Sequence, residues 1–168
     1  MKDIQEQSKF IINRFDHYFD SINNKGVFYI TINTFFLGVL FTQVEVILNA
    51  GDRSWWIYTL VLGFVLINVF SNILTILSIN PFKSPKCDDG PSLIYFHDIA
   101  CKELKEFTTE FASQSDEFLN KDFSNQIHQL AGGLNIKFDR LRYAGLLLLL
   151  QFVSLIPIVF VTILNVKK

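Results

Sequence analysis

The chain has 168 residues and a formal net charge of −1, and half of its residues are hydrophobic, with 18 phenylalanines in all. This composition is typical of membrane and amphipathic helices and argues against a soluble globular domain. The polar remainder is too short for a conventional enzyme domain. Since the sequence encodes no broad basic surface, we expect no binding to duplex nucleic acid.

Three long runs of the sequence contain no Asp, Glu, Lys or Arg, namely residues 27–44, 54–82 and 143–166. A helix needs roughly 20 apolar residues to cross the hydrocarbon core of a bilayer. Each run reaches or nearly reaches this length. We therefore predict an all-α integral membrane protein with three transmembrane helices, near residues 27–49, 55–79 and 144–165.

The basic residues predict the orientation of these spans. Most of the 15 Lys and Arg residues precede the first run or lie between the second and the third. The positive-inside rule places such regions in the cytoplasm. With three spans, the N-terminus and the region between the last two spans share one side, so both are predicted to be cytoplasmic. The first span follows an amphipathic stretch rather than a short basic leader, and we expect no cleaved signal peptide.

The regions outside the spans are polar and helical in pattern. Residues 1–26 predict an amphipathic helix that continues toward the first span, with a bend allowed near Gly26. Residues 80–143 form the predicted cytoplasmic helical domain. It starts with a proline-rich loop, continues as an amphipathic helix over about residues 98–118, breaks near residues 119–122 and then runs as a helix into the third span. Residues 93–96 read either as a strand or as a buried turn, and residues 166–168 form a short tail.

Polar residues recur at helical spacing inside two of the predicted spans. In the second span they include Asn68, Ser71, Asn72 and Thr75, and in the first they include Thr34 and Glu45. One interpretation is that they form packing seams with hydrogen bonds between helices. The other is that they form a surface that lines water or associates with further copies of the chain. For Glu45, hydration at the outer interface, pairing with Arg53 and a role in an ion path remain alternatives.

Two clusters combine aromatic and ionisable side chains. The first is Tyr95, Phe96, His97 and Asp98, and the second contains Lys137, Arg140 and Arg142. In one interpretation the aromatic residues are core and the cations form a collar where a helix enters the membrane. In the other, the cations hold a phosphate while an aromatic ring stacks on a base. No nucleophile, zinc or phosphate-loop motif accompanies these residues, so we expect no catalytic residue, no metal site and no enzymatic activity.

The same two regions resemble a known family. Residues 92–100, in which an aromatic pair precedes His-Asp-Ile-Ala, resemble the entry segment of the Pycsar transmembrane effector family. Residues 122–143 of this chain resemble the second helix of that family. The pattern that carries this resemblance is Asp122, Gln126-Ile127, Leu130-Ala131, Leu134, Lys137-Phe138 and Leu141-Arg142-Tyr143. A pair of spans before this region and one span after it have the same layout, so the resemblance covers nearly the whole chain.

The resemblance implies an antiphage defence effector of the bacterial inner membrane. In such a system a partner cyclase makes cCMP or cUMP on infection, the cytoplasmic region of the effector responds, and impairment of the membrane causes abortive infection. By this resemblance we expect the nucleotide to bind near the first cluster, with its phosphate at the cations of the second cluster. We also expect several copies of the chain to assemble on activation, and we expect no cofactor. The alternatives are a constitutive transporter or ion-path subunit, and a membrane scaffold that binds a protein partner.

Overall fold

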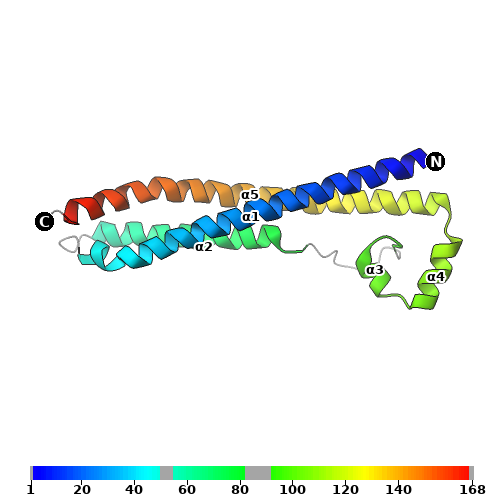
Figure 1. The fold of residues 1–168 in the computed structure, drawn as a ribbon, viewed down its shortest axis with the longest axis horizontal. Helices are drawn as coiled ribbons and strands as arrows, with labels where there is room; N and C mark the ends of the chain where they lie inside the picture. Colours follow the sequence, from blue (N-terminus) through cyan, green and yellow to red (C-terminus); the bar gives the residue numbers. More distant parts are fainter. Residues whose placement is uncertain (1, 50–54, 82–91, 167–168) are drawn as a thin grey trace. The chain divides into compact units, whose positions relative to one another are not determined.

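The computed structural model describes residues 2–49, 55–81 and 92–166. Within these ranges all regular elements are helices, as predicted: α1 (Lys2–Asn49), α2 (Trp55–Ile79), α3 (Phe96–Ala100), α4 (Leu104–Ser113) and α5 (Asp116–Val166) (Figure 1). Residues 50–54, which lie between the first two predicted spans and include Arg53, are outside the described residues. So are most of the proline-rich loop and the last two residues of the tail.

Three helical stretches are long and apolar enough to span a membrane. They are Ile4–Glu45, Trp55–Ile79 and Asp116–Phe160. The predicted second span has the bounds of α2, whereas the first and third predicted spans are parts of the much longer helices α1 and α5. The prediction of three spans is therefore confirmed by length and composition, and the chain fits a multi-pass membrane protein.

Gly26 lies inside α1 without ending the helix. Its place is explained by packing, because a Cβ atom added at Gly26 would lie 2.5 Å from Cγ2 of Ile79. The glycine lets α1 approach the end of α2 closely, as small residues do in membrane helix packing. No helix break separates the amphipathic N-terminal segment from the first span in this continuous helix.

The chain divides into two compact units. The first contains Met1–Asp20 and Pro81–Asn135, and the second contains Ser21–Asn80 and Ile136–Lys168. Because α1 and α5 each run through both ranges, each helix contributes one part to the first unit and one part to the second. The second unit contains α2 and the parts of the other two span stretches that follow Asp20 and Asn135.

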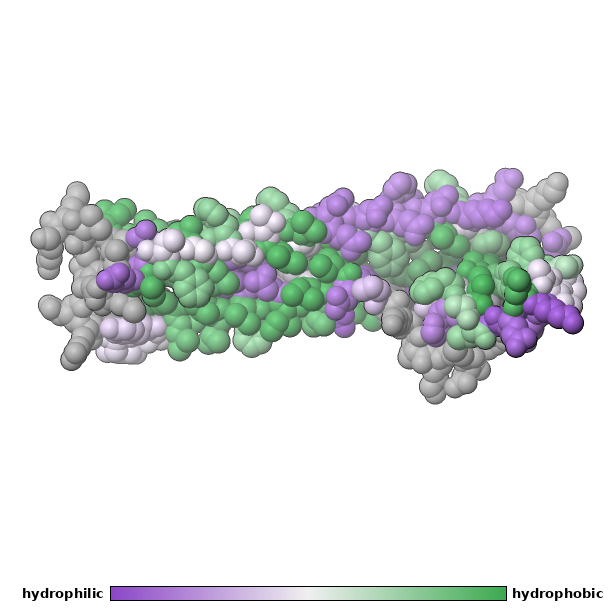
Figure 2. All heavy atoms as spheres, turned by 60° about the horizontal axis from the view of Figure 1, so that its bottom comes forward, coloured by the Kyte–Doolittle hydropathy of each residue, from purple (hydrophilic) through white to green (hydrophobic). Residues whose placement is uncertain are grey.

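The second unit has an apolar core and an apolar outer surface. Its core cluster contains Phe36, Leu40, Ile57, Phe64, Leu148 and Ile158. The rings of Phe36 and Phe152 meet edge to face with their centroids 4.9 Å apart. Large apolar side chains are also exposed on this unit, among them Phe35, Phe41 and Phe70, and Figure 2 shows apolar residues covering most of its visible face. An apolar outer surface of this kind is what a lipid environment favours for a helix bundle.

The first unit corrects the expected helix over residues 98–118. The structure has two helices there, because α3 ends at Ala100 and α4 begins only at Leu104. The residue before α4, Glu103, has an extended backbone with ψ of 145°. Amphipathic spacing continued across this turn, so periodicity alone did not reveal it.

The break expected near residues 119–122 is also misplaced. The chain leaves the helix at Gln114, whose ψ is 142°, and α5 starts at Asp116. Ser115 caps the new helix, since its Oγ accepts a hydrogen bond of 3.2 Å from the backbone N–H of Phe118. Serine is a preferred N-cap residue. From Asp116 on, α5 is continuous into the third span, as the sequence predicts.

Candidate functional site

Buried amides and hydroxyls join the three helices of the second unit. We call this group the polar seam, and it consists of Asn33, Asn68, Ser71, Asn72 and Gln151. All except Asn72 are 0% exposed, and Asn72 is half-buried. The residues come from α1, α2 and α5, so every span contributes at least one side chain.

The seam is a connected hydrogen-bond network. Nδ2 of Asn68 donates to Oε1 of Gln151 at 3.0 Å and to the backbone oxygen of Asn33 at 2.9 Å. Nδ2 of Asn33 donates to Oγ of Ser71 at 3.0 Å and to Oδ1 of Asn72 at 3.2 Å. Asn72 in turn donates to Oδ1 of Asn68 at 3.0 Å. Each of the three helices is therefore bonded to at least one other through side-chain amides.

Two buried polar atoms of the seam form no hydrogen bond to the residues that the structure describes. Among the residues that the structure describes, Oδ1 of Asn33 and Nε2 of Gln151 are buried without a hydrogen-bond partner. An unpaired buried polar group costs about 1–3 kcal/mol in proteins, and lipid offers no water to replace the partner. The seam thus holds the helices together while retaining unused hydrogen-bonding capacity.

The predicted polar stripe of the second span lies largely inside this bundle. Asn68, Ser71 and Thr75 are fully buried, which is the placement that the packing interpretation describes. Thr75 bonds back to its own helix, with Oγ1 donating to the oxygen of Ser71 at 2.8 Å. The two residues predicted on the first span, Thr34 and Glu45, are instead exposed.

The residue of α1 that does enter the seam, Asn33, was missed in the sequence. Its signal was its position three and seven residues before Phe36 and Leu40, on what proves to be the core face of α1. Gln151, on α5, likewise shares a face with Leu148 and Ile158. Gln151 is recognisable in the sequence as a polar residue of the third span, and a polar residue in register with core residues is the pattern that would also have found Asn33.

Two of the predicted cations donate hydrogen bonds to backbone oxygens at the C-terminal end of α2. Nζ of Lys137 donates to the backbone oxygens of Ser78 and Asn80, both at 2.6 Å. Nη1 of Arg140 donates to the oxygen of Leu77 at 3.0 Å. Leu77 and Ser78 lie in the last turn of α2 and Asn80 follows it. Carbonyls at this end of a helix have no partner within the helix and carry the negative end of its dipole.

The environment of Lys137 also changes its titration. Burial, and secondarily the charge of Arg140, lower the pKa of Lys137 from its usual 10.5. Arg142, the third predicted cation, is exposed. All three lie on one stretch of α5 in the second unit.

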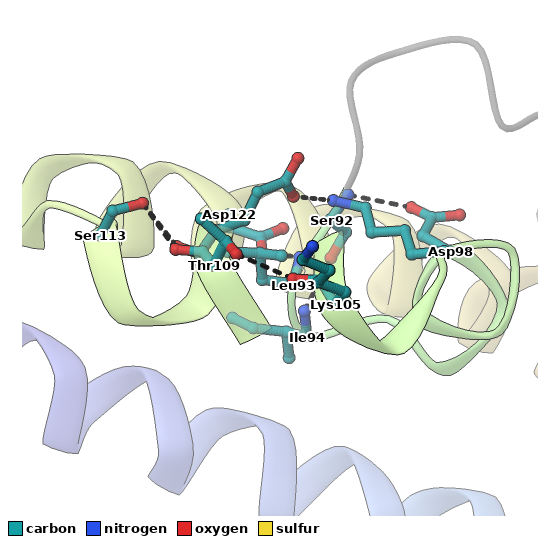
Figure 3. Close-up of polar contacts among 10 residues, drawn as sticks. Ser92, Leu93, Ile94, Asp98, Lys105, Thr109, Ser113 and Asp122 are labelled. Carbon is teal, nitrogen blue, oxygen red and sulfur yellow. Dashed lines mark hydrogen bonds and ion pairs between the residues drawn. The ribbon is translucent and has the colours of Figure 1, made fainter. Parts of the chain in front are cut away.

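The first unit holds the other predicted cluster beside a capped turn. Oγ of Ser92 accepts the N–H groups of Ile94 at 3.1 Å and Tyr95 at 2.9 Å. Oδ2 of Asp122, on α5, accepts the N–H of Leu93 at 2.9 Å (Figure 3). The open choice between a strand and a buried turn at residues 93–96 is thus settled as a turn, with Leu93 buried.

The four predicted residues of this cluster lie around the start of α3. The ring centroids of Tyr95 and Phe96 are 5.0 Å apart, and those of Phe96 and His97 are 6.5 Å apart. Phe96 and His97 are exposed. Asp98 has a structural partner, since its Oδ2 accepts the N–H of Ser92 at 3.2 Å. The structure brings these four residues together in the first unit and the three cations together in the second.

No group of His, Cys, Asp and Glu able to hold a metal ion occurs among the described side chains.

No curated protein and no solved structure matches the chain. The sequence does match the family of the Pycsar effector protein domain over residues 7–164. This match spans both compact units and all five helices, in agreement with the resemblance found in the two segments of the first and second units. The chain therefore belongs to the Pycsar effector domain family.

Proposed function

We propose that this antiphage defence effector responds to a cyclic pyrimidine nucleotide, cCMP or cUMP, by impairing the bacterial inner membrane. A partner cyclase supplies the nucleotide on infection, and loss of the membrane barrier ends growth of the infected cell. The protein itself catalyses no reaction in this scheme. Its N-terminus and the region between the last two spans face the cytoplasm, where the nucleotide is made.

The polar seam is the observation that carries this proposal. A bundle that serves only as an anchor needs no buried amides, which are costly in a membrane. The seam instead supplies hydrogen-bonding groups from three helices at one place, of which Oδ1 of Asn33 and Nε2 of Gln151 have no partner among the described residues. Separation of the helices would present these groups to water or to further copies of the chain, and either outcome breaches the bilayer.

The ligand drives this change only if it binds the open state more tightly than the closed one. A shift from 1:99 to 99:1 requires about 10⁴-fold tighter binding to the favoured state. The exposed aromatic residues Phe96 and His97 are candidates for contact with the nucleotide.

Dye release from vesicles of bacterial lipids tests the proposal. We expect release by the reconstituted protein on addition of cCMP or cUMP, and none with cAMP. The double variant Asn68→Leu with Asn72→Leu replaces two seam amides and should lose the response. Val69→Leu, at an exposed position of the same helix, is the matched control and should respond normally.

The outcomes separate the rival functions. Release by the double variant equal to that of the parent protein would remove the seam from the mechanism. Steady flux without any nucleotide would indicate a constitutive transporter or ion-path subunit. Neither flux nor nucleotide binding would indicate a scaffold.

A further inference from the structure

A small cavity lies in the first unit, at the turn between α4 and α5. It has a volume of about 220 Å³ and is lined by Leu93, Glu110, Ser113, Gln114 and Phe118. None of these residues belongs to the aromatic or cationic clusters described above. The cavity lies at the break at Gln114 and Ser115, where the chain passes from α4 into α5.

Two apolar walls of the cavity are fixed by backbone hydrogen bonds. Leu93 is 5% exposed, and its N–H is held by Asp122, as Figure 3 shows. Phe118 lies in the first turn of α5, where its N–H is held by Ser115. A leucine and an aromatic ring held in place in this way offer apolar surface to a flat ring.

The polar edge of the cavity consists mainly of acceptors. Oε1 of Gln114 is buried and, among the residues that the structure describes, has no hydrogen-bond partner. The carboxylate of Glu110 forms an ion pair with Lys102. The hydroxyl of Ser113 donates to the oxygen of Thr109 at 2.9 Å, which leaves its oxygen able to accept. Such an edge favours a ligand that brings N–H donors, because a buried acceptor without a partner is costly.

The size of the cavity limits what can enter. Pockets that enclose a whole drug-sized ligand have volumes of roughly 300–1,000 Å³, and this cavity is smaller. It can hold a nucleobase while the rest of a nucleotide remains outside. The carboxylate of Glu110 also disfavours an anionic group within the cavity.

We propose that this cavity seats the base of the cyclic pyrimidine nucleotide, an inference that rests on the proposed function. Phe118 lies against the face of the ring, and Oε1 of Gln114 accepts an N–H of the base. The sugar and the cyclic phosphate remain outside, away from Glu110. Since Phe118 is part of α5, the bound base contacts a helix that continues to Val166.

Nucleotide binding to the full-length protein in detergent, measured by calorimetry, tests this assignment. Three variants change the cavity: Ser113→Phe fills it, Gln114→Met removes the acceptor, and Phe118→Ala removes the aromatic ring. Each should weaken binding of cCMP or cUMP at least tenfold, about the loss that one base stack represents. Phe111→Ala is the matched control, because Phe111 is 52% exposed on α4 and does not line the cavity. It should bind within about twofold of the parent protein.

Each result decides the assignment. Parent-like binding by the three variants would overturn it while leaving the proposed function standing, and a loss confined to Phe96→Ala would move the base to the aromatic residues of α3. Absence of binding by the parent protein itself would overturn the proposed ligand and this seat together. Phe118→Ala could lose binding because the first unit unfolds. Ser113 is exposed, so Ser113→Phe removes no core contacts and tests the cavity independently of that variant.

Discussion

Nζ of Lys137 lies 2.6 Å from the backbone oxygen of Ser78, so that a cation on α5 occupies the C-terminal end of α2. Hydrogen bonds to charged groups contribute about 1.5–3 kcal/mol, more than an average neutral bond between membrane helices. This contact therefore fixes α5 against α2 where α5 enters the second unit.

Replacement of this cation should loosen the bundle. We expect Lys137→Met to lower the free energy of unfolding by about 2 kcal/mol, because the carbonyls of Ser78 and Asn80 lose a charged donor. Thermal unfolding in detergent measures the effect. Lys121→Met, at an exposed position of the same helix, is the control, and an equal loss in both variants would contradict the role of Lys137.

The lowered pKa of Lys137 predicts a dependence of stability on pH. Between that pKa and 10.5 the unfolded chain binds more protons at this residue than the folded chain does, so stability rises with pH in this window. Below the window the cost of burying the charge is present in full. The unfolding temperature of the parent protein should therefore rise relative to that of Lys137→Met, so that the difference between the two grows as pH approaches about 10.5. A difference that is independent of pH would contradict the prediction.

The turn at Ser92 depends on one carboxylate of α5. Asp122→Ala removes the acceptor of the Leu93 N–H and should cost about 1–3 kcal/mol, the penalty for a buried donor without a partner. Hydrogen exchange at the Leu93 amide should accelerate strongly. Asn125→Ala, at an exposed position one turn later, should leave this exchange rate unchanged. Continued protection of Leu93 in Asp122→Ala would show that the carboxylate is dispensable.

Two glycines of α1 should respond to alanine in opposite directions. Gly26→Ala places a Cβ 2.5 Å from Ile79, and overpacking of this kind costs about 1–3 kcal/mol. Gly38 has open space around it, so Gly38→Ala should raise helix stability by up to about 1 kcal/mol. Unfolding in detergent tests the pair, and Ile79→Ala should restore stability to Gly26→Ala. Equal effects at the two positions would contradict close packing at Gly26.

Neighbouring polar residues of α1 should also differ. Asn33 is fully buried in the polar seam, whereas Thr34 is exposed. Hydrogen bonds between membrane helices contribute about 0.6 kcal/mol on average and up to about 1.7 kcal/mol. Asn33→Ala removes two such bonds and should lower stability by about 1–2 kcal/mol, while Thr34→Ala should have little effect. A parent-like unfolding midpoint for Asn33→Ala would show that the seam does not stabilise the closed bundle.

The sequence by itself determined the helical class and the three spans. Uncharged runs of the required length leave few structures available in lipid, because backbone groups there must be satisfied within a helix or a closed barrel. The bounds of α2 followed directly from this constraint. The family also followed from the sequence, since the match to the Pycsar effector domain covers residues 7–164.

Tertiary structure decided which polar residues meet. Helical spacing placed Asn68 and Ser71 on one face of α2, but it did not identify Asn33 and Gln151 as their partners, because partner choice depends on how three helices pack. The turn at Gln114 was likewise missed, since the apolar spacing of residues 98–118 is compatible with one unbroken helix. The local spacing of apolar residues indicates that a segment is helical. Where the helix ends and which side chains it brings into contact depend on how distant segments pack against it.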